Sequence, residues 1–196
     1  MTAVPGTSLE AWQGTVKGPH MRWLQTDFAR YVLCPESAVE GWTGQEAIAA
    51  VPDYVLVIEH PSLGGLLCMS GEPMPIAYDE SSRTFIRWDY ADSEDVAAEA
   101  LQKAEQSAAW TTGPMVHIPN ESLVLLDCGY AGSDVTPDNS CSIHLPQGRY
   151  LVRSLEMEIS DSAAFRLDRL VPVTEGQGQA WSGVLQRINL ASPVRG

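Results

Sequence analysis

The sequence predicts an α+β fold, in which mostly antiparallel β-strands form two similar units with one or two packed helices. Short runs of β-branched and aromatic residues recur along the chain between turn-forming residues, which is typical of strands. Residues 92–109 differ, because their apolar side chains recur at helical spacing. The strand-like runs 84–90 and 149–155 resemble each other, and each leads into an acidic stretch with an Asp-Ser pair. This echo favours two related units.

The clearest element pair is a strand followed by an acidic helix. Residues 84–90 are rich in side chains that suit a pleated surface, and Ile86, Trp88 and Tyr90 share one face at a period of two. The Asp-Ser pair at 92–93 offers a short side-chain oxygen that can cap the first turn of the helix. Acids follow in that first turn, where the helix dipole favours them.

Further strands are expected wherever a short apolar run ends at proline, glycine or a polar group. They are residues 31–34, 53–59, 64–69, 115–118, 123–128, 141–145 and 150–158. A short helical turn is expected at 35–42, because proline suits a first helical position. The Pro-Gln-Gly turn at 146–148 predicts a hairpin between the two runs that flank it.

The chain divides into four segments by composition. Residues 1–19 are rich in glycine and proline and predict a loosely ordered N-terminal arm. Residues 20–110 form a first β-rich unit that ends in the acidic helix, and residues 111–173 form a second. Residues 174–196 are expected to be a C-terminal tail.

Composition places the chain among folded soluble proteins. Apolar residues make up 44% and charged residues 19%. No run approaches the roughly 20 apolar residues of a membrane helix, and the N-terminus lacks the features of a secretory signal. We therefore expect a cytoplasmic protein, in which the four cysteines are free buried thiols.

The net charge of −13 is the most informative global property. Such a surface repels nucleic-acid backbones and anionic membranes, so neither is expected as a partner. It steers a basic partner towards the protein at low salt. The alternative is that the charge serves solubility alone.

Metal and catalytic chemistry has little support in the sequence. Cys141 and His144 are the only closely spaced ligand pair, and with Asp127 and Cys128 they fall short of a structural zinc pattern. Alternation in a regular strand puts Cys141 and His144 on opposite faces. We therefore expect no catalytic residue, no metal and no cofactor, with a hydrolase using Asp127 and His144 as the least favoured alternative.

Acidic residues supply the candidate binding surface. The net charge between positions 89 and 105 is −5, and Asp95 and Glu99 lie one helical turn apart on the same side. Glu156 and Glu158 project to one face of a strand. A solvated helix face is the alternative for each carboxylate. The candidate partner-binding residues are Asp89, Asp92, Glu94, Asp95, Glu99, Glu156, Glu158 and the aromatic anchors Trp88 and Tyr90.

Several landmarks in a fixed order resemble a known family. They are residues 31–37 with Trp42 and Gly44, residues 71–75, residues 86–88 and residues 148–150. Together they resemble the immunity protein 21 family of bacterial polymorphic-toxin systems, over most of residues 18–172. The chain departs from the family pattern in a longer polar segment before residue 31 and in its C-terminal extension.

The resemblance implies a protein that binds and neutralises a toxin made by the same cell, without a reaction of its own. The acidic charge agrees with a basic cognate toxin, such as a nuclease, because carboxylates can occupy a phosphate-binding cleft. The resemblance assigns no binding residue. The alternative function is a β-rich interaction or scaffold module with an unknown partner.

Overall fold

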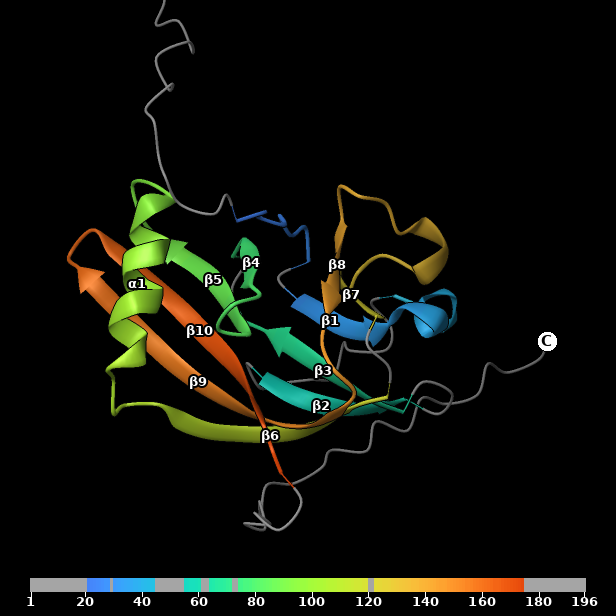
Figure 1. The fold of residues 1–196 in the computed structure, drawn as a ribbon. Coiled ribbons are helices and arrows are strands. Elements are labelled where there is room, and N and C mark those ends of the chain that lie inside the picture. Colours follow the sequence, from blue (N-terminus) through green and yellow to red (C-terminus); the bar gives the residue numbers. More distant parts are fainter. Residues whose placement is uncertain are drawn as a thin grey trace, which may run out of the picture.

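The described residues of the structure, a computed structural model, form two facing five-stranded sheets with one α-helix on an outer face (Figure 1). It describes residues 21–28, 30–44, 55–60, 64–71, 74–119 and 122–174. The predicted N-terminal arm and almost all of the predicted tail lie outside these residues. Every strand pair is antiparallel, so the mostly antiparallel prediction is confirmed.

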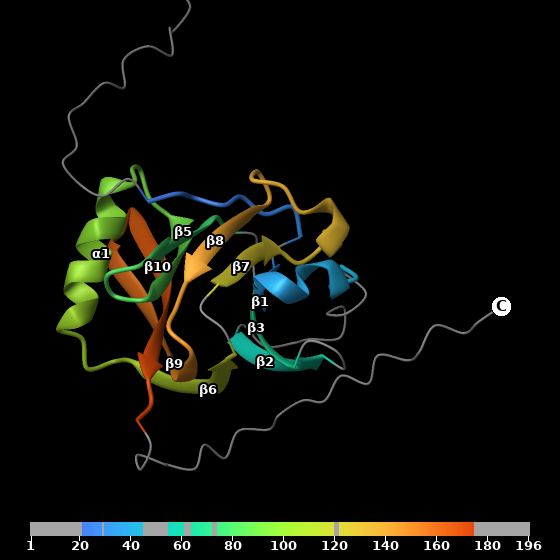
Figure 2. The ribbon, with the colours of Figure 1, turned by 45° about the vertical axis from the view of Figure 1, so that its right-hand side comes forward.

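Sheet I carries the helix. Its strands, in spatial order, are β4 (Ile76–Asp79), β5 (Thr84–Tyr90), β10 (Ala163–Pro172), β9 (Gly148–Ser160) and β6 (Thr111–Ile118). The helix α1 (Asp95–Glu105) lies on the side of sheet I away from sheet II (Figure 2).

Sheet II forms the other layer. Its strands, in spatial order, are β2 (Val55–His60), β3 (Gly64–Ser70), β1 (Arg30–Pro35), β7 (Ser122–Asp127) and β8 (Ser140–His144). Of two short 3-10 helices, η1 (Glu36–Gly41) contacts β1 and β7, and η3 (Gly132–Asp134) contacts η1. The helical turn expected at 35–42 is confirmed as η1.

Both sheets combine strands from the two halves of the chain. Sheet I takes β4 and β5 from the first half and the other three strands from the second, whereas sheet II takes three strands from the first half and β7 and β8 from the second. The division into units at 20–110 and 111–173 stays a prediction, and the sheets do not follow it.

The main core fills the space between the two sheets. Phe85, Val152 and Leu170 of sheet I pack in one cluster with Tyr31 and Leu125 of sheet II, and all five are buried. The single proton of the Tyr31 hydroxyl is shared between the carbonyls of Leu24 and Met74, at 3.0 Å and 2.9 Å, within this core. Alternation along each strand explains the arrangement, since every second side chain points to the opposite sheet.

A second cluster lies on the outer face of sheet II. Trp42, at the end of η1, is buried there, and its indole Nε1 donates to the Cys128 carbonyl at 3.0 Å. The four cysteines are free thiols as expected, although Cys141 is only partly buried. Burial raises the pKa of the Cys34 thiol to about 11 and that of the Cys68 thiol to about 12.

The helix packs on sheet I through small side chains. Ala97, Ala100 and Ala104 are fully buried against a sheet face that includes Leu155 and Phe165. The predicted helix is therefore confirmed, but its predicted cap is wrong. The helix begins at Asp95 with Glu94 at the N-cap, and no side chain caps it.

The predicted alternation of residues 86, 88 and 90 ends early. Ile86 and Trp88 belong to the cluster beneath the helix, but a register shift between β5 and β10 leaves Asp89 as an extra residue. Tyr90 pairs with Ala164, is 43% exposed and does not belong to that cluster. The reason is the β-bulge, which reverses the facing of the residues after it.

The hairpin expected at 146–148 is wrong. The turn does connect two strands, but β8 belongs to sheet II and β9 to sheet I. Leu145 just before the turn is buried in the core between the sheets. Burial of this side chain accompanies a crossing from one sheet to the other, which a turn motif alone cannot reveal.

Candidate functional site

The predicted carboxylates divide between the two faces of sheet I. One group, the helix patch, consists of Asp92, Glu94, Asp95 and Glu99, which are all exposed on or just before α1. The other group lies on the face turned towards sheet II and consists of Asp89, Glu156 and Glu158. Strand alternation places these glutamates on that face, because Leu155 and Met157, which alternate with them along β9, pack beneath the helix on the other face.

The helix patch is partly compensated by its own lysine. The Lys103 Nζ lies 2.8 Å from Glu99 Oε1, one turn along the helix, and both side chains are about half exposed. Exposed pairs of this kind contribute little to stability. Asp92, Glu94 and Asp95 at the start of α1 therefore carry most of the patch's negative charge.

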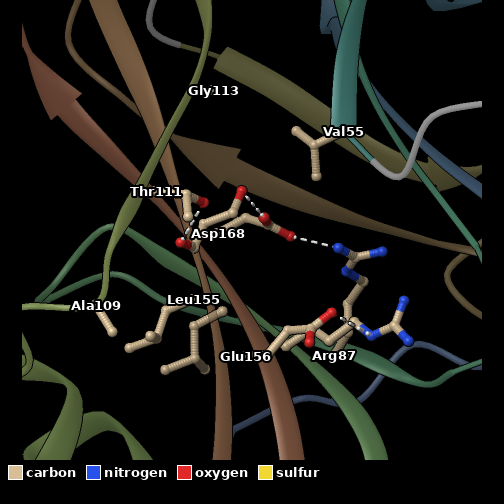
Figure 3. Close-up of a pocket in the computed structure, with 11 residues that line it drawn as sticks. Val55, Arg87, Ala109, Thr111, Gly113, Leu155, Glu156 and Asp168 are labelled. Atoms are coloured by element: carbon tan, nitrogen blue, oxygen red, sulfur yellow. Dashed lines mark hydrogen bonds and ion pairs between the residues drawn. The ribbon is translucent and has the colours of Figure 1, made fainter.

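The second group lines a depression that we call the sheet hollow. It consists of two adjoining hollows, of about 460 Å³ and about 390 Å³, which share Glu156 and Arg166. Figure 3 shows the larger one, whose lining includes Thr111, Leu155, Val55 of β2 and the paired side chains of Arg87 and Asp168. Asp89, Tyr90 and Glu158 line the smaller one.

A buried ion pair forms one wall of the sheet hollow. The Arg87 Nη2 lies 2.8 Å from Asp168 Oδ2, and the two side chains are 5% and 1% exposed (Figure 3). Ser154 donates to the other carboxylate oxygen at 2.6 Å, and Arg87 Nη1 donates to the Ser70 carbonyl of β3 at 2.8 Å. Arg87 therefore links sheet I to sheet II.

Charges at the rim of the sheet hollow are less tightly held. Arg166 Nε lies 3.9 Å from Glu156 Oε1, and the glutamate side chain is 83% exposed. Glu156 can therefore change its partner with little cost to the fold. Glu158 and Asp89 are exposed as well.

The two predicted aromatic anchors take different positions. Trp88 is partly buried on the helix side of sheet I, where its ring centroid lies 5.0 Å from that of Trp23 and 5.7 Å from that of Phe165. This is a packing position. Tyr90 is exposed and lines the sheet hollow, so it alone of the two is placed for contact with a partner.

Sequence reasoning missed a third acidic region, which we call the loop hollow. It has a volume of about 580 Å³, and its lining includes Asp27, Asp127, Tyr130, Asp134 and Asp138. The Tyr130 hydroxyl donates to Asp27, and this hydrogen bond to a carboxylate raises the pKa of the tyrosine. No local signal could reveal the region, because Asp27 and Tyr130 are far apart in the chain.

The geometry disagrees with the hydrolase alternative. The Asp127 carboxylate accepts hydrogen bonds from the Thr26 hydroxyl and from backbone amides that include those of Asp27 and Gly129. His144 lies opposite Ser122, at the other end of β7 from Asp127, and five residues of a strand span about 17 Å. The two side chains therefore cannot act together.

Cys141 and His144 are the closely spaced pair of possible metal ligands in the sequence. Cys141 packs against the core between the sheets, whereas His144 is exposed, so the predicted opposite facing is confirmed. Among the residues that the structure describes, no group of three or more His, Cys, Asp or Glu side chains is placed to hold a metal ion.

No helix within the described part of the chain is long and apolar enough to cross a membrane.

Comparison with known proteins gives one informative result. Neither the curated proteins nor the solved structures contain a match to the chain. A family model described as Immunity protein 21 matches residues 1–163, which is most of the chain. The match includes the N-terminal segment that the motif order leaves out, and it ends at the first residue of β10. The chain belongs to the Immunity protein 21 family.

Proposed function

We propose that this protein binds a cognate toxin of its own cell and neutralises it without catalysis. Membership of the Immunity protein 21 family is the observation that carries the proposal, because an immunity protein implies a toxin as its partner. The separation of Asp127, at one end of β7, from His144 of β8, which pairs with Ser122 at the other end, agrees with a binding role, since it removes the catalytic pair of the hydrolase alternative.

The charge of the chain supports a basic toxin as the partner. The net charge is −13, and seven predicted contact carboxylates are exposed on two faces of sheet I, namely Asp89, Asp92, Glu94, Asp95, Glu99, Glu156 and Glu158. Complementary charge of this kind raises the rate of association and suppresses wrong partners. A nuclease is the toxin class that fits best, because its cleft already attracts phosphates and would accept carboxylates in their place.

The same charge supports the expected absence of other partners. A strongly acidic surface is repelled by nucleic acids and by anionic lipids, so we propose that the protein binds neither. We further propose that it acts in the cytoplasm, where a toxin made by the same cell would first be met.

Co-expression tests the proposal directly. The chain is expressed together with the product of the neighbouring gene, and growth rescue and co-purification are scored. We expect growth to be restored and a stable one-to-one complex to be isolated. If the chain neither rescues growth nor binds that product, the toxin-binding function is wrong, and a β-rich interaction module with another partner becomes the better explanation.

A further inference from the structure

We propose that the sheet hollow is the centre of the toxin contact, and that it receives a chain segment bearing a lysine or arginine side chain. The inference rests on the proposed function and adds to it the surface and the chemistry of the bound segment. Three properties of the sheet hollow support it: its shape, its charge and a buried donor in its wall.

The shape of the sheet hollow suits an extended segment. Its two parts join at Glu156 and Arg166, and together they follow β9 from Ser154 to Glu158. Four residues of a strand span about 13 Å, so about four residues of an extended chain fit along it. Sheet II covers Val152 and Leu170 of sheet I in the core, and the sheet hollow begins where this cover ends, with Val55 of β2 in its lining.

The charge of the sheet hollow selects a basic side chain. Arg87 and Asp168 neutralise each other, which leaves the exposed carboxylates of Asp89, Glu156 and Glu158 against the guanidinium of Arg166. The site is therefore net negative. The exposed Tyr90 ring beside these carboxylates can also stack against a cationic group.

A buried donor in the wall indicates what else the segment supplies. Within the part of the chain that the structure describes, the Arg87 Nε has no hydrogen-bond partner, although the Arg87 side chain is only 5% exposed. A buried donor without a partner is costly, so an incoming acceptor is favoured there. A backbone carbonyl fits better than a carboxylate, because Asp168 already compensates the charge of Arg87.

A pair of neighbouring alanines provides a matched test. Ala108 and Ala109 are both exposed, but only Ala109 lines the sheet hollow. We expect Ala109→Trp to fill the space and to weaken binding of the purified toxin at least about 30-fold, as loss of an interface centre does. Ala108→Trp should bind as the unaltered chain does. If the two variants bind the toxin equally well, the inference is wrong.

Charge reversal gives a second, independent measurement. Glu156→Lys/Glu158→Lys in the sheet hollow and Asp134→Lys/Asp138→Lys in the loop hollow change the net charge by the same amount. We expect the first pair to accelerate dissociation of the toxin complex at least about tenfold, and the second to leave the dissociation rate unchanged. The opposite pattern would move the contact to the loop hollow and overturn the inference.

Thermal melting of the variants without toxin shows whether the sheet hollow is open for the toxin or is already filled by a segment of the protein's own chain. If a segment of this chain fills the sheet hollow, Ala109→Trp will melt well below Ala108→Trp, and that result contradicts the inference. If the unaltered chain rescues growth and Ala109→Trp binds the toxin as tightly as the unaltered chain does, the inference is overturned but the proposed function stands. Failure of the unaltered chain to rescue growth overturns both.

Discussion

Arg87 shows how a single side chain connects fold and candidate site. It pairs with Asp168 within sheet I, donates to the Ser70 carbonyl of sheet II and lines the sheet hollow. Removing one partner of a buried ion pair leaves the other charge uncompensated, typically at a cost of about 3–5 kcal/mol. Variants of Arg87 would therefore report on folding as much as on binding, which is why neighbouring exposed residues are better probes of the site.

Asp79 at the turn between β4 and β5 makes stability depend on pH. Burial alone would raise the pKa of its carboxyl, but hydrogen bonds from Ser82 and Ser81 outweigh burial and lower the pKa. The carboxylate therefore stabilises the fold above the ordinary aspartate pKa of about 4, and this contribution is lost as the pH falls through the lowered value.

We expect Asp79→Asn to lower the free energy of unfolding by about 1 kcal/mol at neutral pH, a modest value because solvent reaches part of this carboxylate. The difference from the unaltered chain should shrink as the pH falls below about 4. Urea unfolding at several pH values measures it. The exposed neighbour Glu80, changed to Gln, serves as the control. A difference that stayed constant with pH would contradict the role given to the Asp79 charge.

Gly132 is required by the close approach of η3 to η1. A Cβ added at this glycine would lie 1.7 Å from the Val39 carbonyl oxygen, and the Gly132 amide donates to the Trp42 carbonyl at 2.8 Å. Because backbone atoms cannot yield as a flexible side chain does, we expect Gly132→Ala to lower the free energy of unfolding by at least about 2 kcal/mol.

Gly148 offers the matched control for Gly132. A Cβ added there meets only the Tyr150 ring, at an ordinary contact distance of 3.8 Å. Gly148→Ala should therefore change the unfolding midpoint in urea by much less than Gly132→Ala. Equal midpoints for the two variants would show that η1 and η3 can separate at little cost.

At the scale of elements, small side chains set the distance between α1 and sheet I. Ala100 is fully buried in this contact, whereas Ala98 on the same helix is exposed. We expect Ala100→Leu to force the helix away from the sheet and to cost about 1–3 kcal/mol. Leucine and alanine have nearly the same helix propensity, so Ala98→Leu should leave the stability of the fold almost unchanged. Thermal melting compares the two, and equal melting temperatures would contradict close packing of α1.

Local pattern was sufficient for elements in which most side chains follow the strand or helix period. Residues 84–90, despite the buried Arg87, the 3-10 turn after β1 and the acidic helix were all predicted, because propensity and the apolar pattern agree there. The strand β10 escaped prediction, since Arg166 and Asp168 interrupt its apolar pattern. Asp168 is buried only because its partner Arg87, distant in sequence, lies on the adjacent strand.

The candidate site was predictable in composition but not in arrangement. The carboxylates were singled out correctly as exposed groups, yet the sequence could not show that Asp89, Glu156 and Glu158 gather in one hollow. Their gathering depends on β10 lying between β5 and β9, and non-local strand pairing leaves no trace in a local pattern. The β-bulge at Asp89, which turns Tyr90 towards the sheet hollow, is equally invisible locally.

At the scale of the whole molecule, each sheet contains strands from both halves of the chain, and this arrangement affects how the halves can fold. Residues 20–110 alone would lose two strands from sheet II and three from sheet I, and the three include the central strand β10 and its neighbour β9. The outer faces of both sheets are also covered by segments from the first half, α1 and η1. The fold therefore depends on contacts between residues far apart in sequence, which is typical of slowly folding β-rich proteins.

The net charge of −13 gives the last prediction, which concerns the rate of toxin association. Raising salt from about 0.1 M to about 1 M shortens the screening length from about 10 Å to about 3 Å. We expect the association rate to fall about tenfold or more over this range, while the dissociation rate changes little. Stopped-flow mixing with the toxin measures both rates.

The helix patch should contribute to this rate without forming the contact. Asp92→Lys/Glu94→Lys/Asp95→Lys is expected to slow association and to flatten its salt dependence, because these exposed carboxylates attract the toxin before docking. The dissociation rate should stay unchanged in this triple variant, whereas Glu156→Lys/Glu158→Lys is expected to raise it. A toxin that associates with the triple variant as fast as with the unaltered chain would exclude the helix patch from steering. An accelerated dissociation of that variant would instead place the helix within the interface, on the face of sheet I opposite the sheet hollow.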